Sequence, residues 1–161
     1  MAKPSVYVET SVISYLASRP SRDVIVAGHQ QITLEWWDAR DDWRLFISPL
    51  VLREAGGGDA EAATRRLSFA QGLAVLPITD AAQTLATVLL AGAALPAKAA
   101  EDALHIAIAA VHRMEYLLTW NCRHIANASK RLMIATLCEQ QGYRPPIICT
   151  PEELLGENYV D

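Results

Sequence analysis

Short apolar runs that alternate with longer helix-forming segments are the feature that most constrains this fold. Strand-like runs occupy residues 6–8, 45–47, 74–76, 116–119 and 147–149. Helical patterns occupy residues 23–40, 59–71, 79–91, 98–114 and 129–141. Short buried strands separated by helices of this length are typical of βαβ units with a parallel sheet. We therefore predict a three-layer α/β/α fold, with a central parallel sheet of about five short strands and helices on both faces.

Capping residues support these boundaries. Asp59 and Thr79 stand where N-caps are expected, and Gly142 follows the helix at 129–141. Thr150 opens a Thr-Pro-Glu-Glu capping box after the final strand. Because no repeat and no Ser/Gly-rich linker divides the chain, we predict a single domain over residues 1–161.

Composition narrows the class of function. The net charge is -4, with 52% hydrophobic and 20% charged residues, which suits a compact protein and argues against disorder. A chain that binds nucleic acid through bulk charge is usually basic, so any contact with nucleic acid must come from a local basic patch. An acidic balance remains compatible with a nuclease, because sites for hard metal ions are built from carboxylates.

The cysteines and the longest apolar stretch indicate where in the cell the protein is expected. Cys122, Cys138 and Cys149 fit no zinc-binding spacing, so we interpret them as free thiols of a reducing compartment. The apolar stretch at residues 85–95 is shorter than the ~20 residues of a membrane span. We expect a cytoplasmic protein without a membrane segment.

Acidic and amide side chains stand just after the predicted strands. Glu9 follows the first strand, Glu54 comes soon after the second, and Asn121 follows the strand at 116–119. In parallel α/β sheets the active site lies at the carboxyl ends of the strands, so these side chains should converge. Taken singly, each also fits a turn residue or the solvated end of a helix.

A fourth acidic position opens the apolar helix at 98–114. Glu101 and Asp102 both lie there, and spacing alone does not choose between them. An acid in a first turn is also favoured by the helix dipole. The Asp102-x-x-His105 spacing matches helix-borne metal ligands, but a bundle-type di-iron site needs two such motifs. We therefore interpret His105 as an ordinary helix histidine.

Four ordered motifs resemble those of the PIN-domain family. They are YVETSVI at 7–13, SPLVLRE at 48–54, DALHIA at 102–107 and LLTWN at 117–121. The ordered set covers nearly the whole chain, and the third motif selects Asp102 over Glu101. The resemblance implies a PIN-like fold and Mg²⁺- or Mn²⁺-dependent hydrolysis of RNA phosphodiester bonds. Many small members resemble VapC toxins, ribonucleases of type II toxin–antitoxin pairs, which implies a homodimer and a partner antitoxin.

The resemblance also suggests roles for individual residues. Glu9, Glu54 and Asp102 are expected to organise the metal, and Asn121 to complete the catalytic set as an outer ligand or water-orienting group. Thr10 and Thr119 would hold a water or phosphate. Three basic residues close to the motifs would meet the RNA backbone, namely Lys98, Arg123 and Lys130.

Two departures from the family pattern keep an alternative open. Glu9 and Asn121 stand where the family usually has Asp. An amide oxygen binds a hard cation more weakly than a carboxylate, so a weak or inactive module that binds RNA or a protein is the alternative. A phosphohydrolase or phosphoacceptor domain would need Asp as nucleophile after the first strand, and Glu9 argues against it.

The helix at 23–40 carries two apolar stripes. Ile25, Ile32 and Trp36 follow one face, and Val26 and Trp37 follow another. Either one stripe is exposed as a protein interface, or both are buried in the core.

Overall fold

The computed structural model describes residues 2–92 and 95–156, so residues 1, 93–94 and 157–161 of the predicted domain lie outside the described residues. Five parallel strands form one sheet in the order β3-β2-β1-β4-β5. The strands are β1 (Ser5–Val8), β2 (Arg44–Ile47), β3 (Ala74–Val75), β4 (Tyr116–Leu118) and β5 (Ile147–Cys149). All four residues of β1 are buried, as expected for a central parallel strand covered on both faces.

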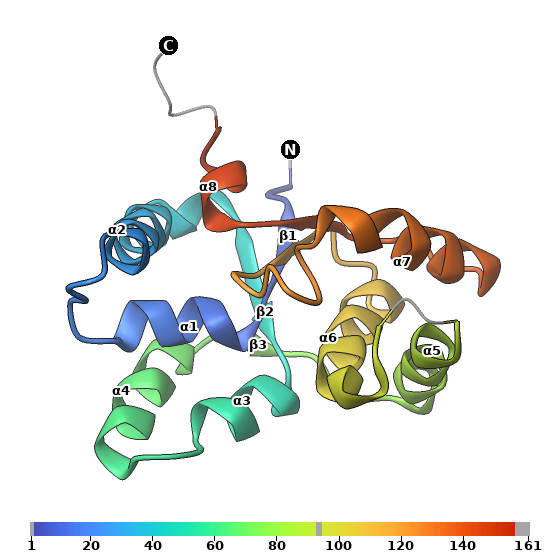
Figure 1. Ribbon diagram of the computed structural model, residues 1–161, viewed down its shortest axis with the longest axis horizontal. Helices are drawn as coiled ribbons and strands as arrows, with labels where there is room; N and C mark the ends of the chain where they lie inside the picture. The colour runs from blue at the N-terminus through green and yellow to red at the C-terminus, as the bar shows by residue number, and fades with distance from the viewer. Residues whose placement is uncertain (1, 93–94, 157–161) are drawn as a thin grey trace.

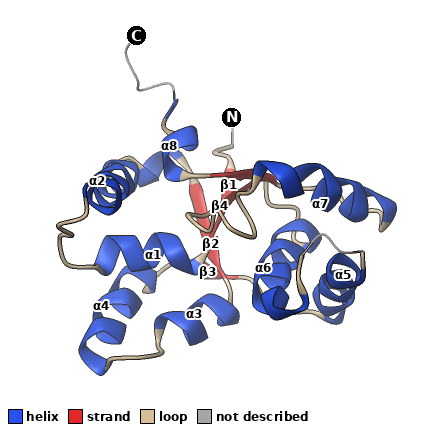
Figure 2. Ribbon diagram, viewed as in Figure 1, coloured by secondary structure: helices blue, strands red, loops and turns tan. Residues whose placement is uncertain are grey.

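Helices cover the two faces of the sheet in separate groups (Figure 1). The first group contains α1 (Thr10–Ala17), α2 (Val24–Asp38), α3 (Pro49–Ala55), α4 (Ala60–Ala70) and α8 (Pro151–Leu154). The second contains α5 (Asp80–Ala91), α6 (Ala100–Val111) and α7 (Ala128–Gln140). Figure 2 shows the strands between these two groups, which confirms the predicted three-layer α/β/α fold.

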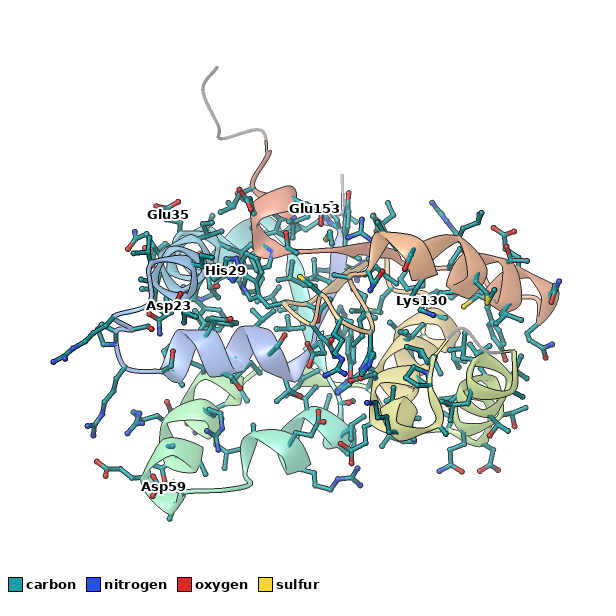
Figure 3. The ribbon with its side chains drawn as sticks, viewed as in Figure 1. Asp23, His29, Glu35, Asp59, Lys130 and Glu153 are labelled. Carbon is teal, nitrogen blue, oxygen red and sulfur yellow. The ribbon has the colours of Figure 1, made fainter. Side chains whose placement is uncertain are left out.

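Local capping explains where the helices begin. Asp23 and Asp59, labelled in Figure 3, accept backbone hydrogen bonds at the starts of α2 and α4. Thr79 caps α5 in the same way, and Thr150 and Glu153 form the predicted capping box. Each cap satisfies backbone N–H groups that have no partner within the helix.

Two predicted helices are shorter than expected. Residues 97–99 form a short 3-10 helix (η2, Ala97–Ala99) before α6, and α6 ends at Val111 rather than at 114. Likewise α2 ends at Asp38, and Arg40–Asp42 forms the 3-10 helix η1. A helical residue pattern continues through such tight turns, so the pattern alone overestimates the length of the helix.

The two stripes of α2 do not separate into a buried and an exposed face. Trp36 is fully buried and Trp37 is half-buried against Phe69. The most exposed apolar side chains lie instead at the start of the helix, where Val24 is 85% and Ile25 is 71% exposed, while Leu34 in its second half is 43% exposed. The tryptophans therefore belong to the core and its margin.

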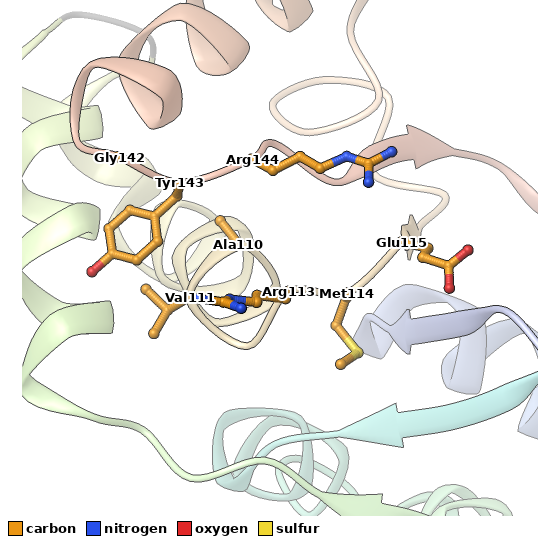
Figure 4. A pocket seen from close by; sticks show the side chains of 8 residues that line it. All are labelled: Ala110, Val111, Arg113, Met114, Glu115, Gly142, Tyr143 and Arg144. Atoms are coloured by element: carbon orange, nitrogen blue, oxygen red, sulfur yellow. The ribbon is translucent and has the colours of Figure 1, made fainter. Parts of the chain in front are cut away.

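Backbone strain marks the end of α6. Arg113 has φ 59°, and the turn is a Schellman motif in which Arg113 N–H donates to Ala110 O and Met114 N–H donates to Ala109 O. Only glycine adopts this left-handed conformation without steric cost. Arg113 lines a pocket of about 440 Å³ with Arg144 and Glu115, at the amino ends of β4 and β5 (Figure 4).

Replacing Arg113 by glycine is therefore expected to stabilise the protein. Relief of the left-handed strain should raise the free energy of unfolding by about 1 kcal/mol. Urea unfolding measures the change. Arg113→Ala is the matched control, because it removes the same side chain but keeps Cβ. Equal stabilisation by alanine would mean that side-chain repulsion, and not backbone strain, is the cause.

Candidate active site

The side of the sheet to which the chain adds strands changes at β1. From β1 it adds β2 and β3 on one side, and then β4 and β5 on the other. The carboxyl ends of β1 and β4 thus form the topological switch point, where open α/β sheets bind ligands. Glu9 follows β1 and Thr119 follows β4, and Thr119 Oγ1 donates to Glu9 Oε1 across this point at 2.5 Å.

Glu9 is buried and firmly held. Its side chain is the N-cap of α1, where it accepts from Ser11 N at 3.0 Å and from Ser11 Oγ at 2.5 Å. Ser11 Oγ also accepts from Trp120 N at 2.8 Å, which ties the first motif to the fourth. A carboxylate with 5% exposure is costly to desolvate, and these donors together with the N-terminus of α1 offset that cost.

Glu54 lies in the last turn of α3 and reaches both Thr10 and His105. Its Oε1 accepts from Thr10 Oγ1 at 2.6 Å and lies 2.6 Å from His105 Nε2. Burial by itself raises the pKa of the Glu54 carboxyl, but the hydrogen bond and charge of His105 and the hydrogen bond of Thr10 lower it to about 2. Glu54 is therefore ionised at neutral pH.

His105, which the sequence suggested is an ordinary helix histidine, contacts both Glu54 and Tyr7. Its side chain is fully buried, and its Nδ1 lies 2.7 Å from Tyr7 Oη, which lies 2.8 Å from Ser48 Oγ. The ligand atoms of Glu9, Glu54 and His105 all lie within 4.8 Å of one another. The Asp-x-x-His spacing was the signal, since residues three apart share a helix face, but the sequence could not show what His105 would meet.

Asp102 and Asn121 form a second, adjoining group. Asn121 Nδ2 donates to Asp102 Oδ1 at 3.0 Å, and His124 Nδ1 lies 2.8 Å from Asp102 Oδ2. Asn121 Oδ1 accepts from His124 N, while Asn121 N donates to Thr119 Oγ1 at 2.9 Å. Thr119 thus links this group to Glu9. His124 gave no signal in the sequence.

The structure also shows that Asp102 and its sequence neighbour Glu101 have different surroundings. Asp102 is half-buried in the site, whereas Glu101 is exposed and pairs with Arg53 at 3.1 Å. The ~100° between consecutive helical residues explains this difference. Hydrogen bonds thus connect Asp102, Asn121 and Glu9 through Thr119, while ligand atoms of Glu9 and Glu54 lie within 4.8 Å of one another.

The three basic residues predicted to meet RNA are all at least partly exposed to solvent. Lys98 is exposed in η2, Arg123 is exposed in the turn after Asn121, and Lys130 is half-buried in the first turn of α7 (Figure 3). None of the three forms an ion pair within residues 2–92 and 95–156. Their contact with RNA stays a prediction.

The cysteines stay outside the acidic group. All three are free thiols, with Cys122 exposed and the other two buried. Burial raises the pKa of Cys138 to about 11 and that of Cys149 to about 12, so neither is a thiolate at neutral pH.

Among the residues described, no helix is long and apolar enough to cross a membrane.

Comparison with known proteins places this fold in a structural class. No protein-family model and no curated protein sequence matches this chain. Several solved structures share its fold, among them the following two. VapBC2 from Rickettsia felis, bound to a DNA fragment from their promoter, matches with 16% identity and a TM-score of 0.56, over 91% of this chain and 98% of that one.

The second structure is VapC20 from Mycobacterium tuberculosis, a Sarcin-Ricin loop cleaving toxin. It matches with 14% identity and a TM-score of 0.59, over 76% of this chain and 95% of that one. The likeness confirms that this chain has the PIN-domain fold of VapC structures, as its four motifs predicted.

Proposed function

We propose that this protein is a metal-dependent endoribonuclease, the toxin of a type II toxin–antitoxin pair. The observation that carries the proposal is the convergence of ligand atoms from Glu9, Glu54 and His105 within 4.8 Å at the switch point of a VapC-like fold. One protein of this fold, VapC20, cleaves the Sarcin-Ricin loop. An antitoxin partner is proposed because VapBC2 shares the fold.

The donor set suits a divalent cation. Glu9 and Glu54 supply two carboxylates, and Asp102 brings a third that is linked to Glu9 through Asn121 and Thr119. Carboxylate oxygens are the preferred ligands of Mg²⁺ and Mn²⁺. The low pKa of Glu54 keeps one of these oxygens available at neutral pH, and the hydroxyl donors around Glu9 fix its direction.

The side chains would act on a phosphodiester as follows. Glu9, Glu54 and Asp102 would hold a cation, which would supply neutralisation of the charge on the phosphate oxygens and activation of a water. Thr10 and Thr119 keep the carboxylates of Glu54 and Glu9 in place, which preorganises the site before RNA arrives. Asp102 orients His124, whose Nε2 forms no hydrogen bond within the described part of the chain. Lys98, Arg123 and Lys130 would contact the RNA backbone.

One observation favours the alternative of a weak or inactive binding module. Asn121 brings no negative charge, and its side-chain oxygen already accepts from His124 N. Asn121 therefore binds a cation more weakly than the Asp that the family usually has at this position. Measurable cleavage by the purified protein separates the two readings.

Removal of metal is the direct test. We expect cleavage of single-stranded RNA in the presence of Mn²⁺ or Mg²⁺, complete loss in EDTA, and recovery when excess metal is added back. Asp102→Asn should reduce cleavage strongly, because the variant loses a carboxylate beside the metal. Unchanged cleavage by Asp102→Asn would show that the activity belongs to a contaminant or to another site.

A further inference from the structure

We propose that His105 is a ligand of the metal ion, and that its imidazole makes the site select Mn²⁺ over Mg²⁺. The inference rests on the proposed function, since it concerns the ion of that same site. The four family motifs predict an all-oxygen centre. The side chains in the structure present two carboxylates and one nitrogen instead.

The position of the imidazole is the first argument. His105 Nε2 lies 2.6 Å from Glu54 Oε1 and within 4.8 Å of the Glu9 carboxylate, so a cation bound at this point would take the place of the hydrogen bond between Nε2 and Glu54. Donor atoms at about 2.1 Å from one ion lie up to roughly 4.2 Å apart. The donor atoms of Glu9, Glu54 and His105 all lie within 4.8 Å of one another, so at most a small inward movement is needed to enclose an ion.

The support behind the imidazole is the second argument. Ligating histidines usually donate their other ring N–H to an acceptor, which fixes the tautomer. The Tyr7 hydroxyl lies 2.7 Å from His105 Nδ1 and 2.8 Å from Ser48 Oγ, so it can accept from the ring and donate to the serine.

The third argument is that the other side-chain oxygens of the site, those of Asp102 and Asn121, already form hydrogen bonds. Both carboxylate oxygens of Asp102 already have partners, Asn121 Nδ2 and His124 Nδ1. The side-chain oxygen of Asn121 accepts from a backbone N–H. The carboxylates of Glu9 and Glu54 also accept hydrogen bonds, but among the described residues His105 is the one that offers a further ligand atom within 4.8 Å of both.

The donor chemistry then sets the selectivity. Mg²⁺ demands near-ideal octahedral oxygen coordination and loses its waters reluctantly. First-row transition ions accept imidazole nitrogen more readily, and Mn²⁺ is the first of that series. An O,O,N site should therefore bind Mn²⁺ more tightly than Mg²⁺, and Co²⁺ more tightly again.

Metal titration of the whole protein tests the proposal. Calorimetry should give an affinity for Mn²⁺ at least about tenfold higher than for Mg²⁺. Pulsed electron paramagnetic resonance of the Mn²⁺-loaded protein should show ¹⁴N modulation from a coordinated imidazole. In His105→Gln the modulation should vanish, and the Mn²⁺ affinity should fall by about 10- to 100-fold while the Mg²⁺ affinity changes little.

Two further variants sharpen the result. Tyr7→Phe removes the support but keeps the ligand, so it should retain the ¹⁴N signal and weaken Mn²⁺ binding less than His105→Gln does. His112→Gln is the matched control, because His112 follows α6 and its Nε2 contacts Pro77 O. That control should bind both ions as the parent does.

The outcomes are distinct. Absence of ¹⁴N modulation in the parent, or parallel loss of Mn²⁺ and Mg²⁺ affinity in His105→Gln, would overturn the proposal and leave His105 as a positioning residue for Glu54. Failure of the parent to bind either ion would instead overturn the proposed function. The modulation and the affinity ratio of the parent need no variant, so the test stands even if His105→Gln does not fold.

Discussion

Replacing Glu54 by glutamine is expected to lower the rate of RNA cleavage by about 10²- to 10³-fold, the usual cost of removing one preorganised electrostatic group. Glu54 supplies a carboxylate that is ionised at neutral pH and is held by Thr10 and His105. Glutamine keeps the shape of the side chain but removes the charge that attracts the cation. The measurement is single-turnover cleavage at saturating Mn²⁺, together with the Mn²⁺ affinity.

Glu61→Gln is the matched control for Glu54→Gln. Glu61 is exposed in the first turn of α4 and is not among the groups that shift the pKa of Glu54, so its loss should leave the rate almost unchanged. If the Glu54→Gln protein cleaves RNA as fast as this control, Glu54 is not part of the metal site.

The pH dependence of stability gives an independent check on Glu54. Its pKa is lowered from 4.5 to about 2 in the folded protein, so ionised Glu54 stabilises the fold above pH 4.5, and this contribution is lost as the pH falls towards 2. The difference in unfolding free energy between parent and Glu54→Gln should therefore narrow over that interval. A difference that stays constant down to pH 2 would contradict the depressed pKa.

Replacing Asn121 by aspartate is expected to destabilise the metal-free protein by about 1–3 kcal/mol. The change removes the N–H that Asn121 donates to Asp102 Oδ1 and leaves two carboxylates about one hydrogen-bond length apart. A bound cation offsets this repulsion, so added Mn²⁺ should raise the unfolding midpoint of the variant more than that of the parent. Thermal unfolding across a Mn²⁺ series measures both effects.

Asn127→Asp serves as the control for Asn121→Asp. Asn127 caps α7 through its side-chain oxygen, so aspartate adds the same charge without losing the cap. Its response to Mn²⁺ should match that of the parent. If Asn121→Asp behaves in the same way, residue 121 does not face the metal.

The sequence alone determined the layers of the fold. Val6, Ile47 and Leu118 belong to short apolar runs, and each run became a strand because apolar residues between helices must be buried on both faces of a sheet. Capping residues such as Asp59 and Thr79 marked the helix starts, since a cap is a local interaction. Helix ends were less certain, and Arg113 ended α6 in a conformation that its residue type does not signal.

The sequence also determined which polar residues would lie at the carboxyl edge, because Glu9 and Asn121 follow strands that run parallel. Only the tertiary structure decided their partners. Glu54 meets Thr10 across 44 residues and His105 across 51, and Asp102 meets His124 across 22. Periodicity and capping report on neighbours within one or two turns, whereas these contacts depend on how α1, α3 and α6 pack around the end of β1. That packing brought His105 into the acidic group, although its sequence context suggested an ordinary helix histidine.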